Sequence, residues 1–254
     1  MEPLVSVIMP AYRCAGTIQK AIDSALQQDV PLEVIVLNDQ SPDDLDEVMK
    51  KYAGQEQVRY VHNEKNLGAA ATRNKGVQLA RGSYVAFLDS DDWWDNGKLK
   101  KQFARMKETK AVICSTGREL VTPDGKLTGR QIGVKEIITY RDLLTHNSIN
   151  CSSVLMKTEV AREYPMEHED SHEDYILWLK ILKKYGFACA VNEPLLKYRL
   201  TASGKSGNKL KSAAMTYRVY RYAGFSTASS CVLFCMYAMN GILKYALAYL
   251  RKHR

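Results

Sequence analysis

The fold is decided by the stretch Tyr84-Val85-Ala86-Phe87-Leu88-Asp89-Ser90-Asp91-Asp92-Trp93-Trp94, in which an apolar run ends abruptly in three carboxylates. Residues 84–88 have the length and the composition of a buried β-strand. Such a strand brings the acidic side chains that follow it to the edge of a sheet, where they can hold a divalent cation against phosphate oxygens. The stretch therefore indicates a protein that handles a nucleotide diphosphate.

Apolar runs and helical segments alternate around this stretch. The runs predict strands, and stripes of apolar residues at helical spacing predict helices. Strands are predicted at 5–9, 34–37, 58–61 and 84–88, and helices at 18–26, 68–80 and 96–106. This alternation is typical of an α/β fold with a doubly wound, mainly parallel (mixed) sheet, whose ligands bind beyond the carboxyl ends of the strands.

The second half of the chain is less regular. Residues 111–150 carry weak signals: a strand at 111–115, a turn at Pro123-Asp124-Gly125 and a short helix at Tyr140–Thr145. Later predictions are strands at 149–156, 187–191 and 195–199, a helix at Glu173–Tyr185, a linker at 204–208, and helices at 210–222 and 231–250. We therefore expect a sheet domain over residues 1–203 and a C-terminal helical appendage over 204–254.

Composition and cysteine usage indicate a globular protein of the cytoplasm. The chain has 254 residues, of which 46% are hydrophobic, and this suits one sizeable α/β core. Its six cysteines are scattered without a C-x-x-C pair, so reduced thiols are expected. The N-terminal apolar run is of strand length and follows no basic segment, so no secretion signal is predicted.

The excess positive charge lies entirely in the C-terminal part. Residues 194–254 contain eleven Lys or Arg and no Asp or Glu, within a total net charge of +8. Helices that mix basic, aromatic and apolar residues favour an anionic membrane surface, although packing on the domain or on a second subunit is the alternative. The apolar run is shorter than the ~20 residues that span a bilayer. No nucleic-acid partner is expected, because the chain lacks a recognised motif and its remainder is acidic.

Three loops that follow predicted strands are expected to converge. They carry Pro10-Ala11-Tyr12, then Asp39, then the acidic group Asp89-Ser90-Asp91-Asp92. Tyr12 offers an aromatic face for a base, and Asp39 offers a carboxylate that could accept N–H groups of that base. Together they predict a nucleotide pocket. The alternative for the acidic group is a helix cap made of solvated acids.

A fourth segment runs from Asn66 to Gly76. Gly68 allows close backbone approach at the start of a helix, and Arg73 projects from the first turns. Helix N-terminal amides and a guanidinium together suit a diphosphate or a base carbonyl. Alternatively, Gly68 is only a turn residue and Arg73 a solvated surface charge.

Acidic residues also gather at the start of the helix Glu173–Tyr185. First-turn acids are favoured by the helix dipole in any protein, so capping is one interpretation of Glu173 and Asp174. The other is that Asp174 acts as a general base that deprotonates a hydroxyl nucleophile.

In order and spacing, these motifs resemble the family 2 glycosyltransferases with the GT-A fold, which are inverting enzymes of the bacterial polysaccharide and O-antigen type. The resemblance covers roughly residues 4–200, and five ordered motifs are far more specific than any one alone. The motifs are Val5-Ser6-Val7-Ile8-Met9-Pro10-Ala11-Tyr12, Asp39, Asn66-Leu67-Gly68 with Arg73-Asn74, Asp89-Ser90-Asp91, and Glu173-Asp174 with Trp178.

The resemblance implies a metal-dependent transfer from a nucleotide-sugar donor, commonly a UDP-sugar. The donor site would comprise Pro10, Ala11, Tyr12, Asp39, Asn66, Gly68, Arg73, Asp89 and Ser90. Asp89 and Asp91 would serve the ribose and a Mn²⁺ or Mg²⁺ ion that bridges the diphosphate, with Asp91 as the direct ligand. Asp174 would be the catalytic base, supported on the acceptor side by Glu173 and Trp178.

The expected reaction moves a single sugar to a hydroxyl of a lipid-linked saccharide acceptor at the inner face of the cell membrane. No Gln-x-x-Arg-Trp motif follows Asp174, which argues against a processive synthase. Many relatives carry His shortly after a Tyr-Arg pair, where this chain has Thr201, and the difference bears on how tightly the metal is held. The alternatives are a sugar nucleotidyltransferase, although the Gly-rich basic loop of that class is absent after the first strand, and a non-catalytic nucleotide-sugar-binding protein of the same fold.

Overall fold

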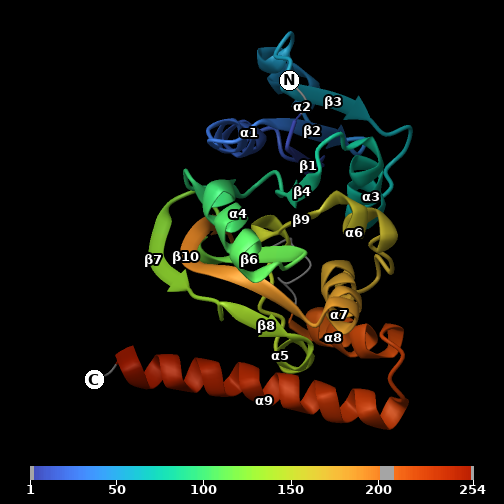
Figure 1. Ribbon diagram of the computed structural model, residues 1–254, viewed down its shortest axis with the longest axis vertical. Coiled ribbons are helices and arrows are strands. Elements are labelled where there is room, and N and C mark those ends of the chain that lie inside the picture. The colour runs from blue at the N-terminus through green and yellow to red at the C-terminus, as the bar shows by residue number, and fades with distance from the viewer. Residues whose placement is uncertain (1–2, 201–208, 253–254) are drawn as a thin grey trace.

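The computed structural model describes residues 3–200 and 209–252, and Figure 1 shows how their helices and strands are arranged. The predicted linker at 204–208 lies outside the described residues. Four parallel strands make the first part of the sheet, in the spatial order β3-β2-β1-β4. They are β1 (Val5–Ala11), β2 (Leu32–Asn38), β3 (Val58–His62) and β4 (Tyr84–Phe87). Their apolar runs predict all four, and the structure confirms them.

Beyond β4 the strands run in mixed directions. β9 (Leu155–Lys157) is antiparallel to both β4 and β6 (Ile113–Val121), and β6 is parallel to β10 (Phe187–Arg199). The short strands β5 (Trp93–Trp94) and β8 (Ile137–Thr139) pair with β10, and β7 (Leu127–Ile132) pairs with β6, all antiparallel. Within the described residues the ten strands form one sheet, so the expected doubly wound, mixed α/β architecture is confirmed.

Helices cover both faces of this sheet. One face carries α1 (Ile18–Leu26), α2 (Leu45–Met49), the 3-10 turn Lys50–Tyr52 and α4 (Lys98–Thr109). The other carries α3 (Ala69–Leu79), α5 (Tyr140–Thr145), α6 (Thr158–Glu163) and α7 (Glu173–Tyr185). Successive strand residues point to opposite faces, so Ile8 packs with the second group while Val7 and Met9 pack with the first. In Figure 1, α1 and α3 accordingly lie on opposite sides of β1.

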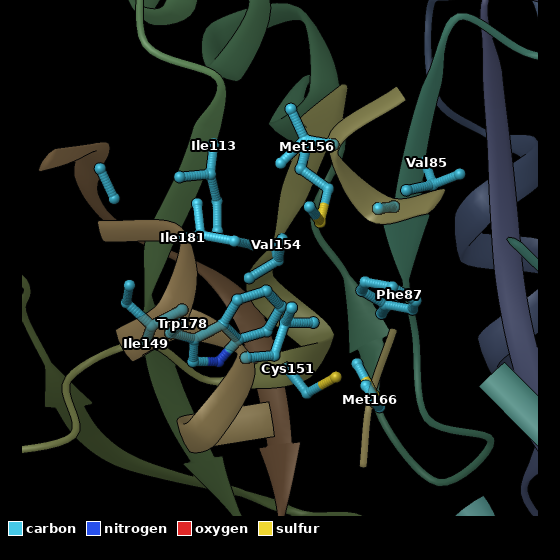
Figure 2. Packing of buried hydrophobic residues seen from close by; sticks show 14 of the residues in the cluster. Val85, Phe87, Ile113, Ile149, Cys151, Val154, Met156, Met166, Trp178 and Ile181 are labelled. Atoms are coloured by element: carbon cyan, nitrogen blue, oxygen red, sulfur yellow. The ribbon is translucent and has the colours of Figure 1, made fainter. Parts of the chain in front are cut away.

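The larger core lies between the sheet and α7, as Figure 2 shows. Phe87 of β4 and Trp178 of α7 are buried in it with ring centroids 6.4 Å apart, and Ile113 and Met156 come from β6 and β9. The sequence predicts Trp178 beside the acceptor, but its side chain is 0% exposed. Trp178 can therefore support the site only through packing.

The predicted strand at 149–156 is wrong over most of its length. Only its end belongs to β9, and it is preceded by the 3-10 turn Cys151–Ser153. The turn forms because the Asn150 side chain accepts the backbone N–H of Ser152 at 3.0 Å, a local bond that competes with strand pairing. As a result, Ser152 Oγ accepts the backbone N–H of Asp89 at 3.2 Å and holds the loop after β4.

The other predictions for the second half are closer. The helices Tyr140–Thr145 and Glu173–Tyr185 have the predicted bounds, and residues 113–115 of the strand predicted at 111–115 belong to the longer β6. The two strands predicted at 187–191 and 195–199 are one strand, β10, with a register shift between Val191 and Leu196. The sequence does not predict β5, which is held by its antiparallel pairing with β10.

The two C-terminal helices pack on the sheet domain and on each other. α8 (Lys209–Tyr222) lies against α7, and α9 (Thr227–Lys252) lies against α5 and α8. Met215, Val219 and Tyr220 are buried, and Tyr220 Oη donates to the backbone oxygen of Leu144 at 2.8 Å. The predicted helices are thus confirmed, and the division at residue 203 stays a prediction. In the described part of the chain, no helix combines the length and the apolar character that crossing a membrane requires.

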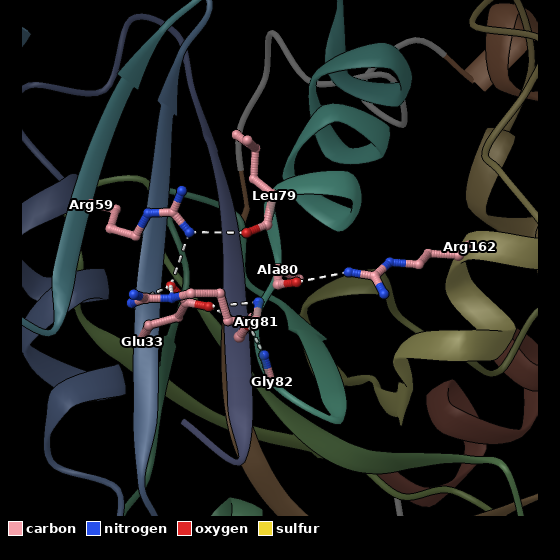
Figure 3. A network of polar contacts seen from close by, with 8 residues as sticks. Glu33, Arg59, Leu79, Ala80, Arg81, Gly82 and Arg162 are labelled. Carbon is pink, nitrogen blue, oxygen red and sulfur yellow. Dashed lines mark hydrogen bonds and ion pairs between the residues drawn. The ribbon is translucent and has the colours of Figure 1, made fainter. Parts of the chain in front are cut away.

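A buried carboxylate joins the strands at the end of the sheet where β4 begins. Glu33 of β2 accepts from Ser6 Oγ at 2.7 Å, from Arg59 Nη1 at 3.1 Å and from the backbone N–H of Arg81 at 2.9 Å. The Arg59 and Arg162 side chains also donate to backbone oxygens at the end of α3, at 2.9 and 2.8 Å (Figure 3). Burial alone would raise the pKa of Glu33, but these hydrogen bonds outweigh burial and lower it.

Candidate active site

A cavity of about 750 Å³ opens beyond the carboxyl ends of β1, β2 and β4. This is the edge where ligands bind in sheets of this architecture. The cavity brings together all ten residues predicted for the donor and the metal. They are Pro10, Ala11, Tyr12, Asp39, Asn66, Gly68, Arg73, Asp89, Ser90 and Asp91. Arg13, Cys14, Thr17, Ala69, Pro123 and Arg199 complete the lining.

Two carboxylates occupy the start of α3, where the sequence predicts free amides for a diphosphate. Asp39 accepts the backbone N–H groups of residues 67 and 68, at 2.7 and 2.9 Å. Glu169, from the loop before α7, accepts those of residues 69 and 70, at 3.3 and 2.7 Å. The protein's own anions therefore satisfy the helix N-terminus that the sequence predicts for a diphosphate, and the amide contact stays a prediction. Gly68 is required there, since its φ of 82° is unfavourable for other residues.

Arg73 lies buried at the centre of the site. Its Nη2 is 2.5 Å from Asp89 Oδ1, and its Nη1 is 3.0 Å from Glu173 Oε1. Burial alone would lower the pKa of Arg73, but these carboxylates outweigh burial and raise it. The interpretation of Arg73 as a solvated surface charge is thus wrong. The guanidinium links the loop after β4 to the first turn of α7.

The acidic group after β4 divides into residues with different surroundings. Asp89 and Asp91 line the cavity, whereas Asp92 is buried and accepts the backbone N–H of Arg199 at 2.8 Å. Burial and the negative charge of Asp89 raise the pKa of Asp91 to about 6. A carboxylate that is destabilised as an anion by its neighbour is one that a cation would stabilise. The alternative of a cap made of solvated acids does not describe these residues.

These carboxylates fit a divalent cation that shares its ligands with a substrate. Among the described residues, no cluster of three or more His, Cys, Asp or Glu side chains could hold a metal by itself. Mg²⁺ and similar ions are commonly bound through one or two carboxylates together with substrate phosphates. Asp91, with Asp89 beside it, offers that kind of partial site.

Asp174 lines a second, smaller cavity of about 220 Å³. The resemblance implies that Asp174 acts on a donor held by the other motifs, but Asp174 and those motifs line two cavities that share no lining residue. Burial and the negative charge of Glu173 raise the pKa of Asp174 to about 7, within the range of a general base. Since Glu173 holds Arg73 and Arg73 holds Asp89, one chain of contacts connects the two cavities.

The second cavity includes residues that sequence reasoning missed. Ser212 of α8 and Tyr237 of α9 form part of its wall, so both C-terminal helices contribute to the site. The other lining residues are Arg118, Asn147, Ile149, Asn150, His172, Tyr175 and Tyr198. His172 and Tyr175 flank the acidic pair Glu173-Asp174, and Tyr198 belongs to the Tyr-Arg pair before Thr201. For Ser212, the sequence signal is the alternation of basic and aromatic residues in α8.

Arg199 closes the first cavity from the side of β10. Its Nε donates to the backbone oxygen of Asp91 at 2.9 Å, and its Nη1 to that of Pro123 at 3.0 Å. The guanidinium of Arg199 therefore lies beside the acidic loop. It is two positions before the point where the resemblance leads us to expect a His. Thr201, which replaces that His, lies outside the described residues.

Known proteins share this architecture and this sequence pattern. A family model described as Glycosyl transferase family 2 matches residues 6–164. The chain is 38% identical to TuaG of Bacillus subtilis (strain 168), a glycosyltransferase assigned to teichuronic acid biosynthesis, over 96% of this chain and 98% of that one. It is 33% identical to WfaP of Escherichia coli, a UDP-Glc:alpha-D-GlcNAc-diphosphoundecaprenol beta-1,3-glucosyltransferase, over 97% of each chain.

Two solved structures show the same fold. TarS of S. aureus in complex with UDP-GlcNAc superposes with a TM-score of 0.71 at 19% identity, over 94% of this chain and 72% of that one. The mannosyltransferase PcManGT from Pyrobaculum calidifontis, in complex with GDP-Man and Mn²⁺, gives 0.69 at 18% identity, over 93% and 69%.

The fold is the GT-A architecture, with its cavity at the carboxyl edge of the parallel strands. The family match and the relatives aligned over nearly the whole chain show family membership from the sequence, in addition to the shared fold. The chain belongs to glycosyl transferase family 2 and is a glycosyltransferase.

Proposed function

We propose that this glycosyltransferase moves one sugar, with inversion, from a UDP-sugar to a hydroxyl of a lipid-linked saccharide during surface polysaccharide assembly. The observation that carries the proposal is the chain of contacts through Arg73. Arg73 contacts Asp89, which lines a cavity large enough for a nucleotide sugar. It also contacts Glu173, the sequence neighbour of Asp174, and Asp174 lines a cavity large enough for one sugar.

The larger cavity is the proposed donor site. Tyr12, half exposed at its rim, would stack on the base, and Asp39 would accept a base N–H through Oδ2, which bonds the backbone N–H of Gly68. Asp89 would contact the ribose, and Arg73 would hold Asp89 in place. Asn66 and Ser90 would add polar contacts along the nucleotide.

Asp91, assisted by Asp89, would hold a Mn²⁺ or Mg²⁺ ion. Such an ion neutralises charge on a departing nucleoside diphosphate. The chain's own contribution is to keep Asp91 at the cavity edge, because Arg199 anchors its backbone oxygen and Ser152 anchors the backbone of Asp89.

Asp174 would act as the general base. Its carboxylate takes the proton of the acceptor hydroxyl as that oxygen bonds to the anomeric carbon, and the bond from this carbon to the diphosphate oxygen breaks with its electron pair leaving on the diphosphate. A single displacement of this kind inverts the anomeric centre. The backbone N–H of Tyr175, which Asp174 Oδ1 accepts at 2.7 Å, keeps the carboxylate oriented.

The acceptor is proposed to be lipid-linked, with the enzyme bound peripherally at the inner face of the cell membrane. On α9, Val232, Met236 and Met239 are spaced by four and three residues and are exposed, so they form one apolar stripe. The basic residues of 194–254 would add attraction to anionic lipids. WfaP, the relative from Escherichia coli, is named for a diphosphoundecaprenol-linked substrate.

The direct test is transfer by the purified full-length chain. UDP-sugars and GDP-mannose would be offered with Mn²⁺ and a GlcNAc-diphosphate-alkyl acceptor, and the product's anomeric configuration would be read by NMR. We expect transfer from one UDP-sugar with inversion and no release of pyrophosphate. A retained configuration, or turnover of sugar phosphate and UTP to pyrophosphate, would refute the proposal.

A further inference from the structure

The cavity that contains Asp174 also contains an arginine without an ionic partner. Arg118 lies on β6 and lines this cavity together with the side chains of Asn147 and Asn150. Among the described residues, no carboxylate oxygen lies within 4.0 Å of its guanidinium. Its Nε is buried and has no hydrogen-bond partner among the residues that the structure describes.

An unpaired, partly buried guanidinium is costly, so its position requires an explanation. Burial lowers the pKa of Arg118, although arginine remains charged in proteins. Its ring contact is with Tyr198, whose centroid is 5.8 Å from Cζ, and this contact supplies little compensation for the lost hydration. The other buried arginine of the site, Arg73, has two carboxylate partners.

Asp92 is the carboxylate whose charge acts on Arg118, but its oxygens lie more than 4.0 Å from the guanidinium. Its Oδ1 accepts the backbone N–H of Arg199 at 2.8 Å, and its buried Oδ2 has no hydrogen-bond partner among the described residues. No hydrogen bond joins Arg118 to this buried carboxyl group, and the fork of N–H donors of Arg118 remains available in the cavity.

Tyr237 lines the same cavity as this guanidinium and the carboxylate of Asp174. After burial, the charges of Asp174 and Arg118 are the main influences on the pKa of Tyr237, the first raising it and the second lowering it. The lining thus includes a negative group that can accept a hydroxyl and a positive group that can bind an anion. Its volume of about 220 Å³ is below the ~300–1,000 Å³ of sites that enclose larger ligands, and this suits a single sugar ring.

We propose that Arg118 binds an anionic group of the acceptor while the acceptor's hydroxyl faces Asp174. The anion would be either the diphosphate attached to the acceptor sugar or the carboxylate of a uronic acid, since both offer the paired oxygens that a guanidinium binds in bidentate fashion. This inference rests on the proposed function and deepens it by defining the acceptor's charge.

The test compares three acceptors with wild-type enzyme and variants. They are a GlcNAc-diphosphate-alkyl, a glucuronic acid alkyl glycoside and a neutral GlcNAc alkyl glycoside. We expect wild type to prefer one anionic acceptor over the neutral one in kcat/KM, and that acceptor identifies the anion. In Arg118→Gln the preference should fall by about 10- to 100-fold, the range of a charge-assisted hydrogen bond. Arg118→Lys should keep part of it.

The matched control is Arg130→Gln, which removes an exposed arginine from the neighbouring strand β7 and should leave the preference unchanged. Equal use of neutral and anionic acceptors by wild type would overturn the inference, as would an equal loss on all three acceptors in Arg118→Gln. Calorimetric binding of GlcNAc diphosphate to wild type and Arg118→Gln tests it without catalysis. Failure of the proposed function would look different, because no donor would then be consumed with any acceptor.

Discussion

Arg73 Nη1 lies 3.0 Å from Glu173 Oε1, although 100 positions of sequence separate the two residues. The contact joins the second turn of α3 to the first turn of α7, and the same guanidinium holds Asp89 after β4. Because all three side chains are partly or fully buried, each charge depends on the others. The relative position of the proposed nucleotide site and the proposed base is therefore set by one arginine.

Removing Arg73 should destabilise the fold as well as the site. Arg73→Ala leaves Glu173 buried without this partner, and breaking a buried ion pair from one side costs about 3–5 kcal/mol of unfolding free energy. Arg73→Lys keeps the charge but cannot reach both carboxylates with a planar fork, so it should lose less stability. Urea unfolding measures both. An Arg73→Ala protein as stable as Arg130→Ala would contradict the account.

Asp174→Asn should abolish sugar transfer while leaving donor binding intact. If Asp174 is the base, kcat should fall by about 10²–10⁴-fold. Because its carboxylate must be ionised, wild-type kcat/KM for the acceptor should rise with pH around the value of about 7 to which burial and Glu173 raise the pKa of Asp174.

Folding stability offers a control for the same variant. A raised pKa in the folded state means that stability is lost as pH rises from the usual carboxyl range toward 7. Asp174→Asn should therefore melt at a higher temperature than wild type at pH 8. Turnover by Asp174→Asn that equals wild type would remove this residue from the mechanism.

Chelation should test the partial metal site at Asp91. EDTA treatment is expected to stop transfer, and added Mn²⁺ or Mg²⁺ should restore it. Asp91→Asn should need at least about tenfold more metal for half-maximal rate, since one anionic ligand is gone. The exposed turn residue Asp124, replaced by Asn, serves as the control. Full activity of metal-free wild type would argue that Asp91 has another role.

The hydrogen bonds of Glu33, which lies far from the active site, should make the stability of the protein depend on pH in the acid range. Its hydrogen bonds lower its folded pKa, so the stabilisation they supply is complete above the usual carboxyl pKa and is lost as pH falls through the lowered value. Glu33→Gln should cost about 1.5–3 kcal/mol at pH 7. The difference in unfolding free energy between Glu33→Gln and wild type should narrow below about pH 4. A gap that stays constant with pH would mean that the ionised form is not what stabilises the sheet.

The apolar stripe on α9 makes the proposed membrane contact testable. We expect the triple variant Val232→Ser/Met236→Ser/Met239→Ser to sediment with vesicles of phosphatidylglycerol and phosphatidylcholine about tenfold less than wild type, or still less. The reason is that three side chains that insert into the membrane contribute several kcal/mol of transfer energy. Leu127→Ser, at an exposed apolar residue of β7, should bind like wild type. If wild type does not bind these vesicles at all, the stripe has another partner.

Much of the fold could be predicted because it depends on local patterns. The strands β1 to β4 are apolar runs bounded by polar loops, and α7 carries its acids at the start and an apolar side, so the bounds follow from neighbouring residues. Local patterns gave the wrong prediction for residues 149–156. They are apolar enough for a strand, but the side chain of Asn150 forms a turn instead.

The residues of the proposed donor cavity could also be predicted from the sequence, since they follow predicted strands or lie near the start of a predicted helix, and parallel strands end at one edge. Glu169 was not. Its carboxylate binds the start of α3 from a loop 99 positions from Ala70, and no local pattern distinguishes it from its acidic neighbours.

The order of strands and helices, the edge where ligands meet and the acidic motifs were determined by the sequence itself, because periodicity and turn chemistry act between residues a few positions apart. Tertiary structure alone decided that Arg73 joins Asp89 to Glu173, that Asp174 lies in its own cavity, and that α8 and α9 complete this cavity with Ser212 and Tyr237. Those contacts depend on side chains that meet only after the sheet has brought distant segments together, and no local spacing encodes them.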